Sequence, residues 1–334
     1  MTDKLNINRR HLIAGAGIAA TAAVAAKAQT QTHGEASQPD LSGKSILITG
    51  TSSGFGRLGA EHYARLGAKV FATMRNLPRA EADELTALAG QENLDITLIE
   101  IDVTKDDQVE AGVAKALAVA DGKLDVLINN AGIAFSGPIE VQDLEATQLI
   151  FDTNVFGPQR MIRTVLPSMR NVGSGHIINI TSQLGRVIIP GIGQYSPTKF
   201  ALEALSEQLA YETVSQGIEV TAIQPGGYPT EIWENQSLLS AALKARSSQE
   251  LLAAYPQMTA NMGAPGGGTS DTDPIDIPHA IAEIIAMPAG TKPLRRALHP
   301  VARPQEAINS VSAKQQLAML GNSPYGPLVK AVLD

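Results

Sequence analysis

The chain of 334 residues contains no cysteine and only one tryptophan, and aromatic residues make up 4% of it. Without cysteine there can be no disulfide framework, no thiolate zinc site and no cysteine nucleophile, whichever compartment the protein occupies. Lysine and arginine number 26 against 33 aspartates and glutamates, which gives a formal net charge of -7. That balance lacks the positive field that holds a nucleic-acid backbone, so we expect no nucleic acid among the partners.

The first 28 residues have the three-part order of a secretory signal peptide. Lys4 and the pair Arg9-Arg10 precede an uncharged run over residues 12–26, and Ala26-Lys27-Ala28 has the small-x-small pattern of a cleavage site. The run is about 15 residues long, whereas a membrane span needs about 20. The arginine pair resembles the twin-arginine export signal of bacteria. We therefore predict cleavage after Ala28 and a periplasmic protein without a remaining membrane span, with a frayed N-terminal tail on a cytoplasmic protein as the alternative.

From residue 44 onward, short β-branched runs alternate with longer helical patterns, which indicates βαβ units and a parallel sheet. Strands are predicted over residues 44–49, 69–73, 95–101, 124–128, 175–180, 218–223 and 294–298. Helices are predicted over residues 56–66, 80–89, 106–119, 141–170 with a break at Gly157-Pro158, 197–216, 275–286 and 304–319. The sequence thus predicts a polar linker over 29–43 and one doubly wound Rossmann domain over 44–334, with seven parallel strands and helices on both faces.

Ligands of such sheets bind beyond the carboxyl ends of the strands, where small and polar residues gather in this sequence. After the first strand, Gly50, Gly54 and Gly56 open a helix, so bare backbone amides could face a diphosphate. A tight turn that only packs closely is the structural alternative. The same segment satisfies G-x-S-x-G, which would make Ser52 the nucleophile of a serine hydrolase with His279 or His299 as the base. In that fold several strands precede the nucleophile, whereas here only the predicted signal and linker do.

Five motifs follow one another in the chain: Thr49-Gly50-x-x-x-Gly54-x-Gly56, Asn129-Asn130-Ala131-Gly132, Ser182, Tyr195-Ser196-Pro197-Thr198-Lys199 and Pro225-Gly226. Together they resemble the classical short-chain dehydrogenase/reductase family over residues 44–230. The resemblance implies hydride transfer between a nicotinamide cofactor and a carbonyl or alcohol on a single-domain Rossmann fold. A dinucleotide-binding sensor that keeps the fold without turnover is the non-catalytic alternative.

Reduction of a ketone by hydride leaves an alkoxide, so the site needs a proton donor and a group that stabilises the negative charge. Tyr195 can supply the proton, and Lys199, four residues along the same helical face, would favour its phenolate. Ser182 can donate a hydrogen bond to the substrate oxygen, and the resemblance gives Asn154 the role of linking the lysine to a water relay. Each of the four also has an ordinary structural explanation, such as a helix start, a strand-end turn or a capping amide.

The resemblance also implies the cofactor. NAD-dependent members of the family carry an acid at the end of the second strand, where this chain has Met74 followed by Arg75. A planar cation suits a 2′-phosphate, so we expect NADP(H). The predicted cofactor-binding residues are Gly50, Ser52, Ser53, Gly54, Phe55, Gly56, Arg75, Asp102, Val103, Asn129, Ala131, Gly132, Tyr195, Lys199, Pro225, Gly226 and Thr230.

Residues 226–273 contain the single tryptophan, Trp233, among leucine, alanine, glycine and methionine. In this family the corresponding segment is the substrate lid, and its apolar content suggests a lipophilic ketone or alcohol. A core extension or a subunit contact is the alternative. Family members pair through helices that correspond to 158–170 and 197–216, which implies a homodimer or homotetramer. The six histidines are scattered, so no metal site is predicted.

Overall fold

The computed structural model describes residues 38–266 and 271–333. The predicted signal peptide and the first part of the predicted linker lie outside these ranges. In the part of the linker that is described, Leu41 is fully buried, and its backbone amide donates to the Leu66 carbonyl. No helix within the described ranges is long and apolar enough to cross a membrane.

Seven parallel strands form one sheet in the order β3-β2-β1-β4-β5-β6-β7. The strands are β1 Ser45–Ile48, β2 Lys69–Met74, β3 Ile96–Glu100, β4 Val126–Asn129, β5 Gly175–Ile180, β6 Ile218–Pro225 and β7 Arg295–Leu298. The predicted single α/β domain with seven parallel strands is confirmed. The strand order reverses direction between β1 and β4, and ligands of open α/β sheets bind beyond the carboxyl ends of the strands at such a switch point.

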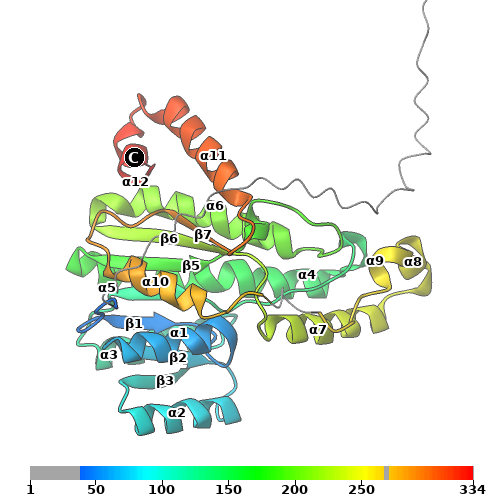
Figure 1. Cartoon of the computed structure of the whole chain (residues 1–334), viewed down its shortest axis with the longest axis horizontal. Helices are drawn as coiled ribbons and strands as arrows, with labels where there is room; N and C mark the ends of the chain where they lie inside the picture. Colours follow the sequence, from blue (N-terminus) through cyan, green and yellow to red (C-terminus); the bar gives the residue numbers. More distant parts are fainter. Residues whose placement is uncertain (1–37, 267–270, 334) are drawn as a thin grey trace, which may run out of the picture. The chain divides into compact units, whose positions relative to one another are not determined.

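Helices cover both faces of the sheet, as predicted for parallel strands. On β1, Ile46 and Ile48 pack against one helical layer, and Leu47 packs against the other. The first layer holds α1 Gly54–Arg65, α2 Ala80–Glu92 and α10 Asp276–Ala286. The second layer holds α3 Asp106–Val119, α5 Gly157–Val172 and α6 Tyr195–Thr213. Figure 1 shows α1 and α10 in front of the strands.

The predicted helix over 141–170 exists, but its predicted break at Gly157-Pro158 is wrong. Helix α4 spans Leu144–Phe151, a π-helical segment η3 spans Asp152–Phe156, and α5 follows without interruption. Pro158 lies in the first turn of α5, where its missing N–H removes no helical hydrogen bond. The irregularity therefore falls on the segment that contains Asn154, and π-helical turns are frequent at functional sites.

Other boundaries also differ from the prediction. Helices α1 and α6 begin two residues earlier than predicted, so Gly54 and Tyr195 each open a helix. The predicted lid contains three helices that the sequence did not reveal: α7 Ile232–Arg246, α8 Gln249–Ala254 and α9 Pro256–Thr259. The chain ends in α11 Gln305–Leu320 and an unpredicted α12 Gly326–Leu333. Short 3-10 turns lie at η2 Ile139–Val141, η4 Gln183–Gly185 and η5 Val214–Gln216.

The turn between β1 and α1 is closely packed against the end of β4. Gly50 has a φ of 71°, and a Cβ on it would lie 2.9 Å from the Ala131 Cα. A Cβ on Gly56 would overlap both the Gly50 carbonyl oxygen and the Asn130 amide nitrogen. That amide donates to the carbonyls of Thr49 and Gly50 at 2.9 and 3.0 Å. Glycine is therefore required at both positions by close contacts with backbone atoms and, at Gly56, also with the Asn130 side chain.

Replacing Gly56 by alanine should destabilise the fold by about 2 kcal/mol or more, because the Gly50 carbonyl is backbone and the Asn130 side chain is held by two hydrogen bonds. Gly90→Ala is the matched control: Gly90 also lies inside a helix, but a Cβ there meets nothing within 4 Å. That change should stabilise the protein by up to about 1 kcal/mol through helix propensity. Urea unfolding of the three proteins measures both effects, and equal midpoints for Gly56→Ala and the wild type would contradict this account of the turn.

Candidate active site

The first turn of α1 is shaped for an anion. Its N-cap residue, Ser53, makes no side-chain capping hydrogen bond within the described residues, and the first turn holds no acidic residue. Uncapped amides and the positive end of the helix dipole attract negative charge. A Cβ on Gly54, whose φ is 54°, would lie 3.3 Å from the Thr230 Cβ, so the loop after β6 closes over this turn.

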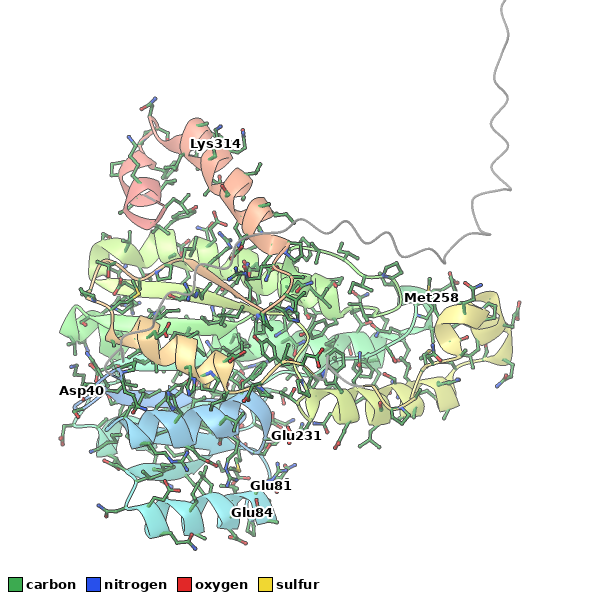
Figure 2. The ribbon with its side chains drawn as sticks, viewed as in Figure 1. Asp40, Glu81, Glu84, Glu231, Met258 and Lys314 are labelled. Atoms are coloured by element: carbon green, nitrogen blue, oxygen red, sulfur yellow. The ribbon has the colours of Figure 1, made fainter. Side chains whose placement is uncertain are left out.

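The surface between that loop and α1 forms a pocket. It is lined by Ser52, Ser53, Gly54, Arg57, Leu58, Glu61, Glu84, Pro229, Thr230, Glu231 and Pro274. Figure 2 labels Glu231 and, on α2, Glu84. Arg57 binds Glu61 at 2.5 Å and lies 3.8 Å from Glu84, so its charge is already shared between two carboxylates.

Arg75 differs from Arg57 in its surroundings. It follows β2 directly, is exposed, and forms no ion pair with any residue in 38–266 or 271–333. Met74, at the position of the family's acid, is 2% exposed and packs in the core. Arg75 is therefore available to bind an anionic ligand.

Two further predicted cofactor residues follow β3. One Asp102 oxygen accepts hydrogen bonds from the Thr104 amide and hydroxyl at 3.0 and 2.8 Å. Val103 is buried in the hydrophobic core.

Asn154 joins the π-helical segment to the loop after β4. Its side-chain oxygen accepts from the Ile133 amide at 2.9 Å, and its side-chain nitrogen donates to the Ile133 carbonyl at 2.9 Å. The same nitrogen lies 3.1 Å from the Thr198 hydroxyl on α6. Asn154 thus fixes the β4 loop against the helix that carries Tyr195 and Lys199.

Lys199 is 5% exposed and donates from Nζ to the Ile180 carbonyl, at the end of β5, at 2.9 Å. Burial lowers the pKa of Lys199 to about 8, while the negative charge of Glu203 acts in the opposite direction. Its Nζ lies 5.7 Å from the centre of the Tyr195 ring. A Cβ on Gly132 would lie 3.7 Å from this Nζ and 3.4 Å from the Asn154 side-chain oxygen. The motif after β4 therefore faces the lysine and the asparagine directly.

Burial raises the pKa of Tyr195, while a side-chain hydrogen bond with Ser182 acts in the opposite direction. In the chain without ligands the pKa of Tyr195 is raised on balance, because desolvation of the phenolate is the largest effect. The expected stabilisation of the phenolate by Lys199 stays a prediction. Ser182 also caps the turn η4, since its Oγ accepts from the Leu184 amide at 3.0 Å. Asn154, Ser182, Tyr195 and Lys199 are thereby joined by direct contacts or through Thr198.

Several predicted cofactor residues have structural contacts of their own. Asn129 is 3% exposed and donates to Asn179 on β5 at 2.8 Å, so its amide lies within the sheet. Phe55 packs edge-to-face on Tyr228, with ring centres 5.7 Å apart. Pro225 ends β6, and a Cβ on Gly226 would overlap the His299 ring. These residues are therefore engaged in packing and hydrogen bonds within the protein.

The sequence did not identify Thr49 and Thr198 as site residues. Thr49 Oγ1 accepts from the amides of Asn130 and Ala131, both at 3.0 Å, and so holds the motif after β4. Thr198 Oγ1 contacts Asn154. Thr49 and Thr198 both lie inside the five motifs named above. Their side-chain hydroxyls, which can bind backbone or side-chain groups nearby, were the feature that could have identified them as site residues.

The hydrolase alternative requires a histidine beside Ser52. Within the described residues, Ser52 makes no hydrogen bond to a histidine. His299 Nδ1 accepts from the amides of Val301 and Ala302, and His279 packs on His62 with ring centres 4.5 Å apart. The geometry around Ser52 is therefore that of a strand-to-helix turn.

Residues 44–238 match the family model described as short chain dehydrogenase. The chain is 37% identical to retinol dehydrogenase 8 of Homo sapiens over 192 residues, which are 56% of this chain and 60% of that protein. It is also 37% identical to 3-ketodihydrosphingosine reductase of Bacteroides thetaiotaomicron over 194 residues, 58% of this chain and 67% of that protein. The match thus spans three fifths to two thirds of the length of these relatives.

A solved structure of a short chain dehydrogenase/reductase from Burkholderia phymatum in complex with NAD superposes with a TM-score of 0.66 and 25% identity. The superposition covers 85% of this chain and 97% of that one. The family model covers more than half of the chain, and the fold agrees with it. The protein belongs to the short-chain dehydrogenase family of oxidoreductases.

Proposed function

We propose that the protein is an NADP(H)-dependent oxidoreductase that moves hydride between nicotinamide and the carbonyl or secondary alcohol of a lipophilic small molecule. The observation that carries the proposal is the joined set of Tyr195, Ser182, Lys199 and Asn154 at the carboxyl ends of β4 and β5.

The residues present fit a nicotinamide dinucleotide. The first turn of α1 has no side-chain cap and no acidic residue, so its free amides suit a diphosphate. Gly132 faces the lysine, and Thr230 faces the glycine turn from across the pocket. The cofactor, when bound, supplies or accepts the hydride.

In the reducing direction, Ser182 and Tyr195 act on the carbonyl oxygen of the substrate. The Ser182 hydroxyl donates to the oxygen as negative charge develops, and the Tyr195 phenol gives it a proton. Burial keeps that proton on Tyr195 at neutral pH, which suits a general acid. Lys199 holds positive charge over the ring and stabilises the phenolate that remains.

The buried cluster beside Tyr195 is apolar, which supports a lipophilic substrate. Tyr195 packs against a cluster that joins the loop after β4 to the lid: Phe135, Val141, Ala146, Ile150, Leu243, Leu252 and Met262. The lid is tied down by a two-bond ion pair from Arg246 to Asp143, at 2.6 and 3.0 Å, and by Tyr255 on Glu140. Two relatives named above carry retinol and a ketodihydrosphingosine in their names, and both compounds are lipophilic.

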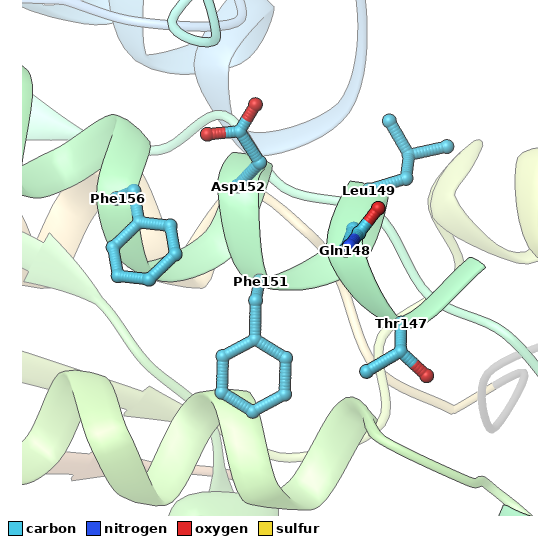
Figure 3. Close-up of a pocket in the computed structure, with 6 residues that line it drawn as sticks. All are labelled: Thr147, Gln148, Leu149, Phe151, Asp152 and Phe156. Carbon is cyan, nitrogen blue, oxygen red and sulfur yellow. The ribbon is translucent and has the colours of Figure 1, made fainter. Parts of the chain in front are cut away.

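We also propose a contact between two copies of the chain across α4, η3 and α6. Leu144, Leu149 and Phe156 are 76%, 39% and 48% exposed, and Phe200 on α6 is 37% exposed. Figure 3 shows Leu149, Phe151 and Phe156 around a pocket on this side of α4 and η3. These exposed side chains support a contact mainly on 144–156 and α6, N-terminal to the 158–170 segment that the resemblance implied. Light scattering on the full chain tests the proposal, and a monomer at micromolar concentration would contradict it.

Tyr195→Phe removes only the proton donor, so turnover should fall at least about 100-fold while NADPH still binds. The assay follows NADPH absorbance over a panel of ketones and aldehydes that includes long-chain compounds. Tyr211→Phe is the control, because Tyr211 lies on the same helix and its hydroxyl contacts Glu207 away from the site. Near wild-type turnover in Tyr195→Phe would refute the assignment. Tight NADPH binding without reduction of any compound by the wild type would support the sensor alternative.

Arg75→Ala should weaken NADPH binding about 10- to 100-fold and leave NADH binding unchanged, because a charge-assisted bond to a 2′-phosphate contributes about 1.5 to 3 kcal/mol. Fluorescence titration with both nucleotides measures the ratio. Arg57→Ala and Arg79→Ala serve as comparisons, since Arg57 and Arg79 are already paired with carboxylates. A wild type that prefers NADH, or an equal loss in Arg57→Ala, would show that Arg75 does not select the cofactor.

A further inference from the structure

We propose that Glu203 is a positioning residue for the catalytic set: its carboxylate fixes the backbone beside Ser182 and keeps a negative charge one helical turn beyond Lys199. The proposal rests on the function proposed above, because Ser182 and Lys199 are the groups that Glu203 acts on. Glu203 itself is 1% exposed, and its carboxylate binds Thr181, Gln224 and Arg295.

Glu203 contacts the chain on both sides of Ser182. Its Oε1 lies 2.6 Å from the hydroxyl of Thr181, the residue immediately before the serine. The Thr181 hydroxyl has one proton to donate and two acceptors within reach, the Glu203 carboxylate and the Ile223 carbonyl, which lies at 2.8 Å. The shorter distance is the one to the charged carboxylate of Glu203. On the other side, a Cβ on Gly185 would lie 3.0 Å from the Glu203 Cγ, so the turn η4 packs directly on the glutamate stem. The strand end and the turn that hold Ser182 therefore rest on one side chain.

The carboxylate is bound by residues from two strands, and a residue from a C-terminal helix supports one of them. Arg295 on β7 donates from Nε to Oε2 at 2.8 Å, and Gln224 on β6 donates to Oε1 at 2.9 Å. Asn309 on α11 donates to the Gln224 side-chain oxygen at 2.7 Å. Arg295 and Asn309 lie beyond residue 238, where the family match ends. The C-terminal part of this chain thus sets the position of Glu203.

The charges that face this cluster come from α6, from β7 and from the residue after η4. Arg295 binds both Glu203 and Glu207, at 2.8 and 2.6 Å, and Arg186 interacts with all three of these groups. Burial lowers the pKa of Lys199, and Glu203 is the neighbouring charge that raises it. Loss of the Glu203 carboxylate should therefore lower the pKa of Lys199 further. Lys199 would then lose its proton, and with it the positive charge beside the Tyr195 ring, at a lower pH.

Glu207 provides a matched control. Glu203 and Glu207 lie one turn apart on α6, and both bind Arg295 through one oxygen. Each change to glutamine therefore leaves Arg295 with one acidic partner, whereas only Glu203→Gln affects Thr181 and Lys199. Thr181→Val separates the two roles, because it removes the hydroxyl while Glu203 keeps its charge and stays paired with Arg295.

The first measurement follows the ionisation of Lys199 without turnover. The full chain is labelled with 13C at the lysine Cε, and the Lys199 signal is identified by its absence in Lys199→Arg. In Glu203→Gln the titration midpoint should move to lower pH than in the wild type, and it should stay in place in Glu207→Gln and Thr181→Val. An unmoved midpoint in Glu203→Gln, or an equal shift in Glu207→Gln, would overturn the electrostatic part of the proposal.

The second measurement is kcat for the carbonyl compound reduced fastest in the panel. It should fall roughly 10- to 100-fold in Glu203→Gln and in Thr181→Val, since a small misplacement of Ser182 is costly, and stay near the wild-type value in Glu207→Gln. Wild-type kcat in Thr181→Val would overturn the positioning of Ser182, and that variant also carries the test if Glu203→Gln does not fold. If the proposed function is wrong, Tyr195→Phe will keep its turnover, which is a separate observation. The titration of Lys199 does not depend on turnover, so it can still be interpreted in that case.

Discussion

A buried ammonium group constrains the arrangement of the whole site. Lys199 is almost inaccessible to water, and a charge in such a place is costly unless it is paired and hydrogen-bonded. The Ile180 carbonyl accepts from its Nζ, and Glu203 lies one turn away on the same helix. Because Ile180 ends β5, this bond fixes α6 to the strand end that leads into Ser182. Tyr195, at the start of α6, is placed by the same bond.

The π-helical segment has a similar cause. In a regular helix from Leu144 to Val172, each backbone amide would bond to the carbonyl four residues earlier. The wider π-helical turn at η3 departs from this pattern, and in it Asn154 contacts the loop after β4. Both polar atoms of its side chain are satisfied there by the amide and the carbonyl of Ile133. The irregular turn is thus offset by hydrogen bonds that hold Gly132 in front of Lys199.

The local parts of the site could be predicted from the sequence, and the long-range parts could not. Strand patterns and the spacing of Tyr195 and Lys199 are local signals, and the structure joins these residues as expected. The Gly157-Pro158 pair led to a wrong prediction of where the helix is irregular. A proline in the first turn of a helix removes no helical hydrogen bond, so the helix continues through Pro158. The contact of Glu203 with Arg295 joins residues 92 positions apart, which no local pattern reveals. Burial of Tyr195 likewise depends on the packed lid, so its effect on the pKa was not foreseen.

Hydride transfer at this site is the central claim, and isotope transfer tests it most directly. NADPH that carries deuterium at both C4 positions of the dihydronicotinamide is incubated with the protein and a prochiral ketone substrate, and the alcohol is analysed by mass spectrometry and NMR. The structure predicts one deuterium at the new carbinol carbon, on one face only, because the buried site around Tyr195 and Ser182 presents a single orientation of the carbonyl. An alcohol that forms without deuterium on that carbon would contradict the account.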